Sequence, residues 1–320
     1  LPQSPQQNKQ LLMVAGLDRY YQLARCFRDE DPRADRELEF TQLDIEMSFI
    51  DEDDIMGLSE ALLVELVRAA APHLHIAQLP FPHLPYAEAM ARYGSDKPDL
   101  RFGLELVDLG PAVAGSSFRV FSDALAEGGE IKGVAAPRVM SRKEIDEFER
   151  MAREMGAAGL VWLAFEPDGV RGTAARFLSA EELAAIRTAA GVQDAATLLI
   201  AAGAPDLVAK VLGRLRQELG RALDLIPADK LCFAWIVDPP LFEWNTDESR
   251  WDAVHHLFTS PQARDLERLG SEPGTVRARA YDMVCNGYEI GGGSVRIHDR
   301  EVQQAVFDLL GLARDEALGH

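Results

Sequence analysis

The sequence predicts an α+β protein in which an antiparallel sheet flanked by helices is interrupted by an inserted α+β module. Two observations carry this prediction. Helix-like and strand-like patterns follow one another at both ends of the chain, and the polar clusters that could carry chemistry lie in those ends. The stretch between them has short β-like runs and capped helices but no such cluster. A discontinuous domain with an insertion gives this distribution, so we expect a first part at 1–104, an inserted module at 105–225 and a second part at 226–320.

In the first part, the apolar pattern of residues 6–17 predicts a helix that ends near Gly16. Residues 20–28 and 39–49 are typical of strands, and a long charged loop joins them. Residues 51–70 predict an amphipathic helix whose acidic first turn suits its positive N-terminal end.

The second of these strands alternates between two faces. The face predicted to be core holds Thr41, Leu43, Ile45, Met47 and Phe49. The opposite face is polar with one aromatic ring, and it holds Phe40, Gln42, Asp44, Glu46 and Ser48. Alternation alone leaves open whether the polar face is a site or is simply solvated. The arginines of the preceding strand and loop favour a site.

The inserted module carries two capping-box signals, in which a serine and a glutamate three residues later satisfy free helix-end amides. The two pairs are Ser141 with Glu144 and Ser179 with Glu182. These capping boxes mark the starts of two helices. Three β-like stretches, at 131–140, 160–166 and 197–203, alternate with those helices. A helix at about 206–225 follows, and residues 232–240 then form an apolar strand of the second part.

Composition limits the partners and the compartment. The 320 residues include 33 Lys and Arg against 52 Asp and Glu, a net charge of −19, so any contact with nucleic acid has to be local. Cys26, Cys232 and Cys285 indicate neither a disulfide framework nor a paired-cysteine zinc site. No apolar run approaches the roughly 18–20 residues of a membrane span, and residues 1–4 lack signal-peptide features. We expect a cytoplasmic protein without a membrane partner.

The first polar cluster, residues 4–9, crowds hydroxyl, amide and ammonium groups at the start of a helix. Gln6 and Lys9 share a face because they are three residues apart. Lys9 would supply a point charge for a carboxylate, although a solvated helix end would give the same pattern.

The second cluster sets Arg28, at the end of a strand, against the polar strand across a loop that contains Arg33 and Arg36. This arrangement suits the clamping of a phosphate beside a stacked ring. Arg28 would bind an α-phosphate, and Phe40 would stack on a nucleobase. A salt-bridged hairpin without a ligand is the alternative.

The third cluster is His255 and His256. Adjacent histidines in a regular strand face opposite sides, so this pair does not predict a two-histidine metal site. One of them lining a pocket is the better interpretation.

The fourth cluster, residues 282–296, contains GGGS between β-like segments rather than in a polar linker. Glycines in such a place let a ligand come close to the backbone. Asp282 and Glu289 are the hard oxygen ligands that Mg²⁺ uses alongside phosphate oxygens, and Arg296 could hold a carboxylate by two hydrogen bonds. Neither GxxxxGK nor GxGxxG after a strand is present, so ATP would have to be held by arginines and an aromatic ring.

These clusters, in this order, resemble the bacterial aspartyl-tRNA synthetases of the class II group. FRDEDPRADRELEFTQLDIE at 27–46 is similar to that family's motif 2, and SPQQNKQLLM, the histidine pair with FTSP, and NGYEIGGGSVRIH at 286–298 fall where the family has them. The inserted module matches the family's GAD domain in place and length. The resemblance implies a class II synthetase-type sheet with a GAD-like insertion. It also implies activation of L-aspartate with ATP, transfer to the 3' end of tRNA(Asp), and a homodimer in the full-length enzyme.

The resemblance implies roles for individual residues. Aspartate would be bound by Ser4, Gln6, Lys9, Arg28, Asp44, His255, His256 and Arg296. ATP would be bound by Arg28, Asp29, Glu30, Glu37, Phe40 and Glu289, and Mg²⁺ with ATP by Asp282 and Glu289. The catalytic residues would be Arg28, Glu30 and Arg296. Lys9 and Arg296 would take the side-chain carboxylate, and asparagine would be rejected because it leaves both cations unpaired.

Several positions depart from the family. Gln7-Asn8 stand where an apolar residue and an aromatic are usual, Glu37-Leu38 replace Gln-Pro, and Leu257 replaces a proline. Glu37 would weaken ATP binding unless Arg33 or Arg36 compensates its charge.

The family's anticodon-binding OB fold, its motif 1 and its motif 3 have no counterpart in the 320 residues, so we expect this segment alone to have little or no activity. Two alternatives stay open: a nondiscriminating enzyme that also charges tRNA for asparagine, and a non-catalytic paralogue that serves as a binding module. Intact Lys9, Arg28, Glu289 and Arg296 argue against the paralogue.

Overall fold

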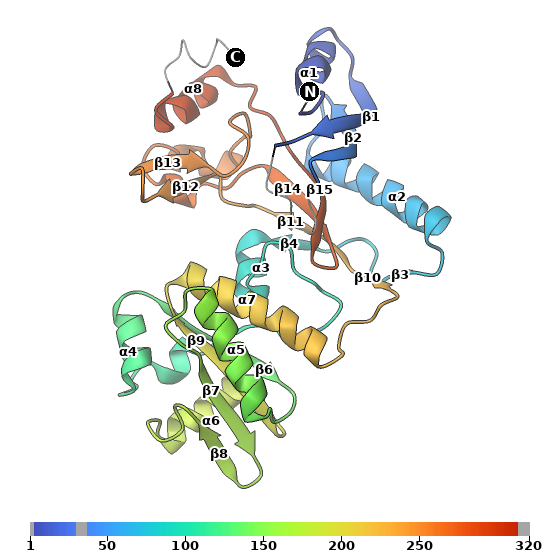
Figure 1. Cartoon of the computed structure of the whole chain (residues 1–320). Helices are drawn as coiled ribbons and strands as arrows, with labels where there is room; N and C mark the ends of the chain where they lie inside the picture. The colour runs from blue at the N-terminus through green and yellow to red at the C-terminus, as the bar shows by residue number, and fades with distance from the viewer. Residues whose placement is uncertain (1–2, 30–36, 313–320) are drawn as a thin grey trace.

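The computed structural model describes residues 3–29 and 37–312. Figure 1 shows a lower body, formed by residues 107–222, and an upper body that carries both ends of the chain. The first elements of the upper body are α1 (Gln6–Val14), β1 (Arg19–Phe27), β2 (Glu39–Met47), α2 (Glu52–Ala70), β3 (His75–Ile76), β4 (His83–Pro85) and α3 (Tyr86–Tyr93). Its later elements are β10 (Lys230–Leu231), β11 (Phe233–Val237), β12 (Phe242–Asn245), β13 (Arg250–Ala253), η2 (Ala263–Arg268), η3 (Pro273–Thr275), β14 (Ala280–Cys285), β15 (Tyr288–Ser294) and α8 (Arg300–Leu309).

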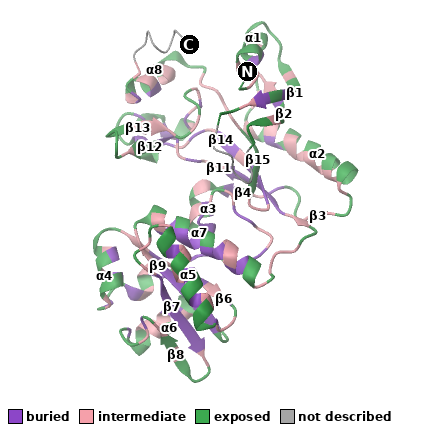
Figure 2. Ribbon diagram, viewed as in Figure 1, coloured by how far each residue is buried: buried purple, intermediate pink, exposed green. Residues whose placement is uncertain are grey.

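The lower body is a three-layer α+β unit. Its elements are β5 (Val107–Asp108), η1 (Gly110–Val113), α4 (Arg119–Ala126), β6 (Glu130–Ala136), α5 (Arg142–Glu154), β7 (Val161–Glu166), β8 (Gly169–Gly172), α6 (Ala180–Ala189), β9 (Ala196–Gly203) and α7 (Pro205–Ala222). The strands form one antiparallel sheet in the order β5-β6-β9-β7-β8. Figure 2 shows its central strands buried between helices.

Apolar side chains of β9 pack against the helices on both faces of this sheet, because successive side chains of a strand point to opposite faces. Leu199 and Ala201 pack in the layer that contains side chains of α5 and α7. Leu198 and Ile200 pack in the layer of α4 and α6. Both predicted capping boxes are present, at the N-termini of α5 and α6, so the local signals for these helices are confirmed.

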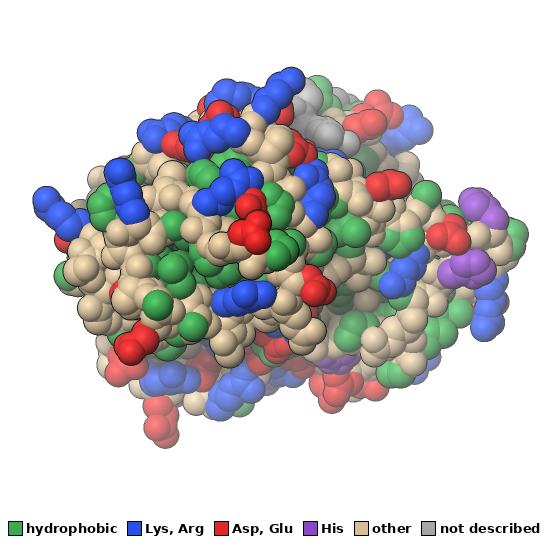
Figure 3. All heavy atoms as spheres, turned by 90° about the horizontal axis from the view of Figure 1, so that it is seen from below, with side chains coloured by type: hydrophobic (Ala, Val, Ile, Leu, Met, Phe, Trp, Pro, Cys, Tyr) green, Lys and Arg blue, Asp and Glu red, His purple; other side chains and the backbone are tan. Residues whose placement is uncertain are grey.

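Acidic and basic side chains interleave on the surface of the lower body, as the view from below shows (Figure 3). Many are joined in ion pairs, among them Arg142 with Asp146 and Arg150 with Glu154, each within α5. Such exposed pairs contribute little to stability. The three arginines of α5, Arg142, Arg150 and Arg153, each lie beside an acidic side chain of the same helix.

The central sheet of the upper body has the order β15-β14-β11-β4. One of its faces packs against α2, through Met56 and the aromatic pair Phe81 and Phe233, whose ring centroids are 4.6 Å apart. The other face packs against α3, through Ala89 and Tyr93. The sheet is therefore covered by a helix on each side. Across residues 3–29 and 37–312, no helix is long and apolar enough to cross a membrane.

The strands of the upper body depart from the expected antiparallel arrangement. The sheet is not purely antiparallel, because β4 runs parallel to β11 and β3 runs parallel to β10. The hairpin of β1 and β2 forms a two-stranded sheet of its own beside the central one. The β1 and β2 strands themselves lie where the sequence predicted them, within two residues at each end.

The face of β2 predicted to be core is the more exposed one. Leu43 is 42% exposed, and Leu23 opposite it on β1 is 71% exposed. On the polar face, Asp44 is only 8% exposed. The reason is a cation from α1, Lys9, which lies against this face and compensates the buried carboxylate. The face of β2 that α1 covers is therefore the one that carries the acidic partner of Lys9, and not the one that the apolar alternation predicted.

Candidate functional site

Lys9 lies at the junction of α1 and the hairpin. Its ammonium Nζ is 2.7 Å from Asp44 Oδ1 and 3.1 Å from Glu46 Oε2. Asp44 and Glu46 share a face because they are two residues apart on β2. The whole Lys9 residue is 7% exposed, so a single ammonium is buried between two carboxylates.

Arg296 reaches α1 from the other end of the chain. It follows β15, where its backbone bridges to Thr259, and its Nη2 donates a hydrogen bond of 3.4 Å to Gln6 Oε1. Gln6 and Lys9 are on one face of α1, one helical turn apart. Ser4, half-buried, precedes the same helix. The structure thus gathers Ser4, Gln6, Lys9, Asp44 and Arg296 around the start of α1.

Asp44 keeps one buried acceptor atom without a protein partner. In the part of the chain that the structure describes, no donor reaches its Oδ2, although Oδ1 accepts from Lys9. A buried acceptor without a donor costs free energy. An ammonium or amide group of a ligand would satisfy it.

The two histidines lie beyond the end of β13 rather than in a strand. The expected opposite orientation of strand neighbours therefore does not apply to them. His255 senses the charge of Glu289, and His256 senses that of Arg296. Burial lowers the pKa of both imidazoles; the cation Arg296 lowers that of His256 further, whereas Glu289 opposes the shift at His255. Both rings are consequently neutral at pH 7.

His255 also presents a buried nitrogen. Its Nε2 has no hydrogen-bond partner among residues 3–29 and 37–312. His256 is more fixed, because its Nδ1 accepts a hydrogen bond of 3.2 Å from the Phe258 amide. The two histidines therefore lie between the Arg296 side of the site, which His256 faces electrostatically, and the Glu289 side, which His255 faces.

Asp282 and Glu289 lie on the same side of the β14–β15 hairpin. Asp282 pairs with Gly292 and Val284 pairs with Glu289, on either side of a bulge between Met283 and Val284. Burial raises the pKa of Asp282 to about 7, and the charges of Glu289 and Asp96 add to the rise. The mutual repulsion of neighbouring carboxylates is the setting in which a cation binds favourably.

The glycine run makes room for the Asp282 carboxylate. A Cβ on Gly292 would clash with Asp282 Oδ1, and a Cβ on Gly293 would lie 2.6 Å from the Tyr281 hydroxyl. A Cβ on Gly291 would meet nothing within 4 Å. GGGS therefore lies within β15, as the sequence indicated, and is no flexible linker.

Lys97 is a site residue that the sequence reasoning missed. Its Nζ is 3.0 Å from Glu289 Oε2, and it opposes the rise in the pKa of Asp282. Lys97 lies between α3 and β5, in a stretch that had been considered only as a possible domain boundary. The dense polar run SDKPD at 95–99 was the available signal.

Arg28 and Phe40 lie at the end of the hairpin where the loop joins β1 to β2. The guanidinium carbon of Arg28 is 5.0 Å from the centroid of the Phe40 ring, and the Arg28 amide donates to the Leu38 carbonyl at 2.9 Å. Asp29 and Glu37 nearby are exposed. The predicted site residue Glu30, and the loop arginines Arg33 and Arg36, lie outside the described residues.

A metal would need ligands beyond the protein at this site. No group of three or more His, Cys, Asp or Glu side chains is placed to hold a metal ion within the two described stretches. Asp282 and Glu289 nonetheless offer the hard oxygen donors that Mg²⁺ takes when phosphate oxygens and water complete its shell. The pair fits a metal that arrives with a nucleotide, and it does not fit an all-protein cage.

Known proteins resemble this chain closely in sequence. The aspartate–tRNA ligase of Geobacillus kaustophilus is 52% identical over 321 residues, which cover 99% of this chain and 54% of that protein. The aspartate–tRNA(Asp/Asn) ligase of Syntrophomonas wolfei is 49% identical, over 99% of this chain and 54% of that protein. The chain thus spans about half the length of the curated relatives it matches.

Solved structures also match the chain. The aspartyl tRNA synthetase of Entamoeba histolytica matches with a TM-score of 0.42 and 15% identity, over 100% of this chain and 43% of that one. The family model described as tRNA synthetases class II (D, K and N) matches residues 1–319, nearly the whole sequence. The chain therefore belongs to the class II tRNA synthetases of the D, K and N group.

Proposed function

We propose that the protein containing this chain is an aspartate–tRNA ligase, which activates L-aspartate with ATP and transfers it to the 3' end of tRNA(Asp). One observation carries the proposal: Lys9 and Arg296, from opposite ends of the chain, flank Gln6 on α1. Two cations around one small space suit a dicarboxylic amino acid. The 52% identity to a relative named aspartate–tRNA ligase supports it.

The amino acid would lie between α1, β2 and the segment that follows β15. Its side-chain carboxylate would bind Lys9 and Arg296, and its ammonium would bind Asp44 Oδ2, which has no donor among the described residues. Ser4 and Gln6 would complete the amino-end contacts. Lys9 is already paired with two carboxylates, so aspartate would join an existing network rather than meet an isolated cation.

His255 and His256 would close over the bound amino acid. Both rings are neutral at pH 7, because burial lowers their pKa values. They can therefore donate or accept hydrogen bonds without adding positive charge. The selection of an acidic side chain is thereby left to Lys9 and Arg296.

Formation of the adenylate needs no general base. The α-carboxylate of aspartate is ionised and attacks the α-phosphorus of ATP, pyrophosphate leaves, and alignment with charge neutralisation lowers the barrier. Arg28 would hold the α-phosphate and the reacting carboxylate, and the Phe40 ring beneath it would stack on adenine. Asp29, Glu30 and Glu37 would complete the adenosine side. The terminal ribose hydroxyl of tRNA would then attack the aspartyl carbonyl and release AMP.

Asp282 and Glu289 would bind Mg²⁺ that enters with ATP. A magnesium ion bound there would supply positive charge against the negative charge of the leaving pyrophosphate. These two residues would hold it through their carboxylate oxygens; burial raises the pKa of Asp282, and the nearby charge of Glu289 raises it further.

Three further features belong to the same proposal. Residues 105–225 would be a GAD-like inserted domain within a class II synthetase catalytic domain formed by 1–104 and 226–320. The complete enzyme would be a homodimer. It would act in the cytoplasm, where its tRNA substrate is found.

A nondiscriminating enzyme is the second candidate, because a relative of 49% identity is named aspartate–tRNA(Asp/Asn) ligase. Both candidates share the chemistry described above and differ only in the tRNA. Aminoacylation of purified tRNA(Asp) and tRNA(Asn) by the full-length protein separates them. Charging of both with aspartate at comparable kcat/KM would establish the second.

The deciding test is ATP–pyrophosphate exchange by the full-length protein. We expect exchange that depends on L-aspartate and is absent with L-asparagine. Titration of a nonhydrolysable aspartyl-adenylate analogue, followed by calorimetry, addresses the remaining rival. If the full-length protein shows no exchange and the titration gives no detectable heat, the proposal is overturned and a non-catalytic binding module is favoured.

A further inference from the structure

A short connection links the lower body to the nucleotide side of the candidate site. This connecting segment, residues 95–103, runs from the end of α3 toward β5. One end of it is enclosed by α7, and Lys97 within it reaches Glu289. The segment therefore touches two regions that are far apart in the sequence.

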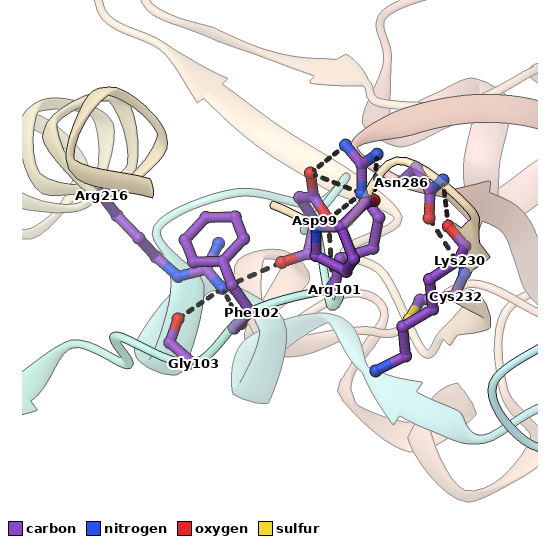
Figure 4. A network of polar contacts seen from close by, with 9 residues as sticks. Asp99, Arg101, Phe102, Gly103, Arg216, Lys230, Cys232 and Asn286 are labelled. Carbon is purple, nitrogen blue, oxygen red and sulfur yellow. Dashed lines mark hydrogen bonds and ion pairs between the residues drawn. The ribbon is translucent and has the colours of Figure 1, made fainter. Parts of the chain in front are cut away.

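Arg216 of α7 encloses the backbone of this segment (Figure 4). The Arg216 residue is 1% exposed, and its Nη2 donates to the carbonyl oxygens of Asp99, Phe102 and Gly103 at 2.9, 3.0 and 2.9 Å. Its Nε donates to the Leu104 carbonyl at 3.1 Å. Because carbonyls accept these bonds, the arginine fixes the path of the main chain.

Two aromatic rings hold the Arg216 guanidinium in place. Its central carbon is 4.2 Å from the centroid of the Phe102 ring and 4.9 Å from that of Tyr93. Such cation–π contacts are strongest where water is excluded. α7 also lies directly on the end of α3, since a Cβ on Gly213 would clash with the Gly94 carbonyl oxygen.

The connecting segment is braced internally as well. The Arg101 guanidinium pairs with Asp99, at 2.7 Å for Nη2 to Oδ2, and its Nη1 donates to the Pro227 carbonyl at 3.4 Å. The Lys97 amide donates to Ser95 Oγ at 3.0 Å. The backbone on both sides of Lys97 is thus fixed by hydrogen bonds.

The tip of the β14–β15 hairpin rests on the same segment. A Cβ on Gly287 would lie 3.5 Å from Asp99 Cβ and 3.8 Å from Gln217 Nε2 of α7. The adjacent Asn286 side chain accepts from the Cys232 amide and donates to the Lys230 carbonyl, both at 2.9 Å (Figure 4). This hairpin carries Asp282 and Glu289, and its turn end meets the segment twice, where Gly287 lies beside Asp99 and where Glu289 pairs with Lys97.

We propose that Lys97 is a positioning residue for the triphosphate side of the site, and that Arg216 holds in place the backbone that presents it. Lys97 fixes the Glu289 carboxylate through the 3.0 Å ion pair and adds positive charge where the phosphates of a nucleotide would lie. The inference rests on the proposed ATP-dependent function. It gives α7 the role of holding, through Arg216, the backbone that carries Lys97. Lys97 is not placed to touch the amino acid, which lies with Lys9 and Arg296.

The first test replaces Lys97 in the full-length protein. We expect Lys97→Met to raise KM for ATP in the exchange reaction, and Kd for a nonhydrolysable ATP analogue with Mg²⁺ by calorimetry, by about 10-fold, as loss of one charge-assisted bond implies. KM for aspartate should change less than about twofold, and Lys97→Arg should recover most of the ATP affinity. Lys210→Met, an exposed lysine of α7, is the matched control.

The second test replaces Arg216. Arg216→Met should weaken binding of the same ATP analogue, and combining it with Lys97→Met should add little, because both changes remove the same contact. Arg214→Met, two residues away on the exposed side of α7, should leave ATP affinity unchanged. Thermal unfolding of each variant separates lost affinity from lost structure, and Lys97→Met tests the proposal even where Arg216→Met does not fold.

The outcomes distinguish this inference from the proposed function. A wild-type protein without aspartate-dependent exchange would refute the function itself. A wild-type protein that exchanges normally, with Lys97→Met binding the ATP analogue as tightly as wild type or more tightly, would refute the role of Lys97. Equal losses of ATP and aspartate affinity in Lys97→Met would refute it too, since they would indicate general disorder of the site.

Discussion

Arg296 and Gln6, separated by 290 positions in the sequence, are joined by a hydrogen bond of 3.4 Å. The contact closes the upper body on itself, because α1 lies near the start of the chain and Arg296 follows β15 near its end. Lys9, one turn along α1, then lies beside the same space with its ammonium held by Asp44 and Glu46. The two ends of the sequence thus bring one cation each to the start of α1.

Substitution of Arg296 tests this arrangement through the affinity for aspartate. We expect Arg296→Met to raise KM for aspartate by about 100-fold or more, because two charge-assisted hydrogen bonds are lost. Arg296→Lys should give an intermediate value, since it keeps the charge but not the planar fork. Steady-state ATP–pyrophosphate exchange with varied aspartate and saturating ATP measures both.

Arg300→Met is the control for Arg296, since Arg300 is exposed at the start of α8. It should behave as wild type. A rise in KM for ATP equal to that for aspartate would contradict the assignment of Arg296 to the amino acid. An unchanged KM for aspartate would contradict it directly.

Local patterns predicted the elements well. The helix at 6–17, the strands at 20–28 and 39–49 and the helix at 51–70 correspond to α1, β1, β2 and α2. The capping boxes at Ser141 and Ser179 open α5 and α6 as predicted. Each of these signals acts between residues a few positions apart, which is why the sequence alone reveals them.

Contacts between distant residues could not be predicted in the same way. The covered face of β2 depends on Lys9 from another element, so hydrophobic alternation led to the wrong face. The parallel pairing of β4 with β11 depends on the path between them, which contains the entire lower body. Lys97 approaches Glu289 from a segment whose backbone accepts hydrogen bonds from Arg216, a further distant residue.

Phe40 gives a second prediction, for the nucleotide. Phe40→Leu should raise KM for ATP by about 10-fold, because stacking of a base on an aromatic ring is lost and because the Arg28 guanidinium loses the ring it lies over. Phe40→Tyr should stay close to wild type. Phe49→Leu is the control, since Phe49 is 96% exposed on the same hairpin segment.

Exchange kinetics with varied ATP measure this effect. KM for aspartate should rise less than KM for ATP in Phe40→Leu, since Phe40 lies near the start of β2 and Lys9 contacts Asp44 and Glu46 farther along that strand. A variant that loses aspartate affinity instead would place the ring beside the amino acid.

Glu144 gives a prediction for stability against pH. Hydrogen bonds from Arg138 and Ser141 lower the pKa of Glu144 from 4.5 to about 2. A carboxyl whose pKa is lower in the folded state stabilises that state above the unfolded pKa, and this stabilisation is lost as the pH falls from about 4.5 toward 2. Glu144→Gln should therefore cost about 1 kcal/mol at pH 7, less than the shift implies because solvent screens the pair.

Urea unfolding of both proteins between about pH 3 and pH 7 measures the difference. The gap between wild type and Glu144→Gln should narrow below about pH 4.5, the unfolded value. Glu147→Gln on the same helix is the control, since Glu147 is exposed and its nearest cation, Arg150, is 4.0 Å away. A gap that stays constant with pH would show that the loss comes from packing rather than from charge.

Two glycines of β15, Gly291 and Gly292, should respond differently to alanine. Gly292→Ala should lower the midpoint of thermal unfolding, because a Cβ would clash with Asp282 Oδ1, and it should weaken binding of a nonhydrolysable ATP analogue by displacing that carboxylate. Gly291→Ala should leave the midpoint unchanged, since a Cβ there meets no protein atom within 4 Å. A loss of ATP-analogue affinity in Gly291→Ala without a change in the midpoint would mean that a ligand approaches the backbone at that point. Equal midpoints for all three proteins would contradict the placement of Asp282 over Gly292, and with it the closeness of Asp282 to Glu289 on which the proposed magnesium site depends.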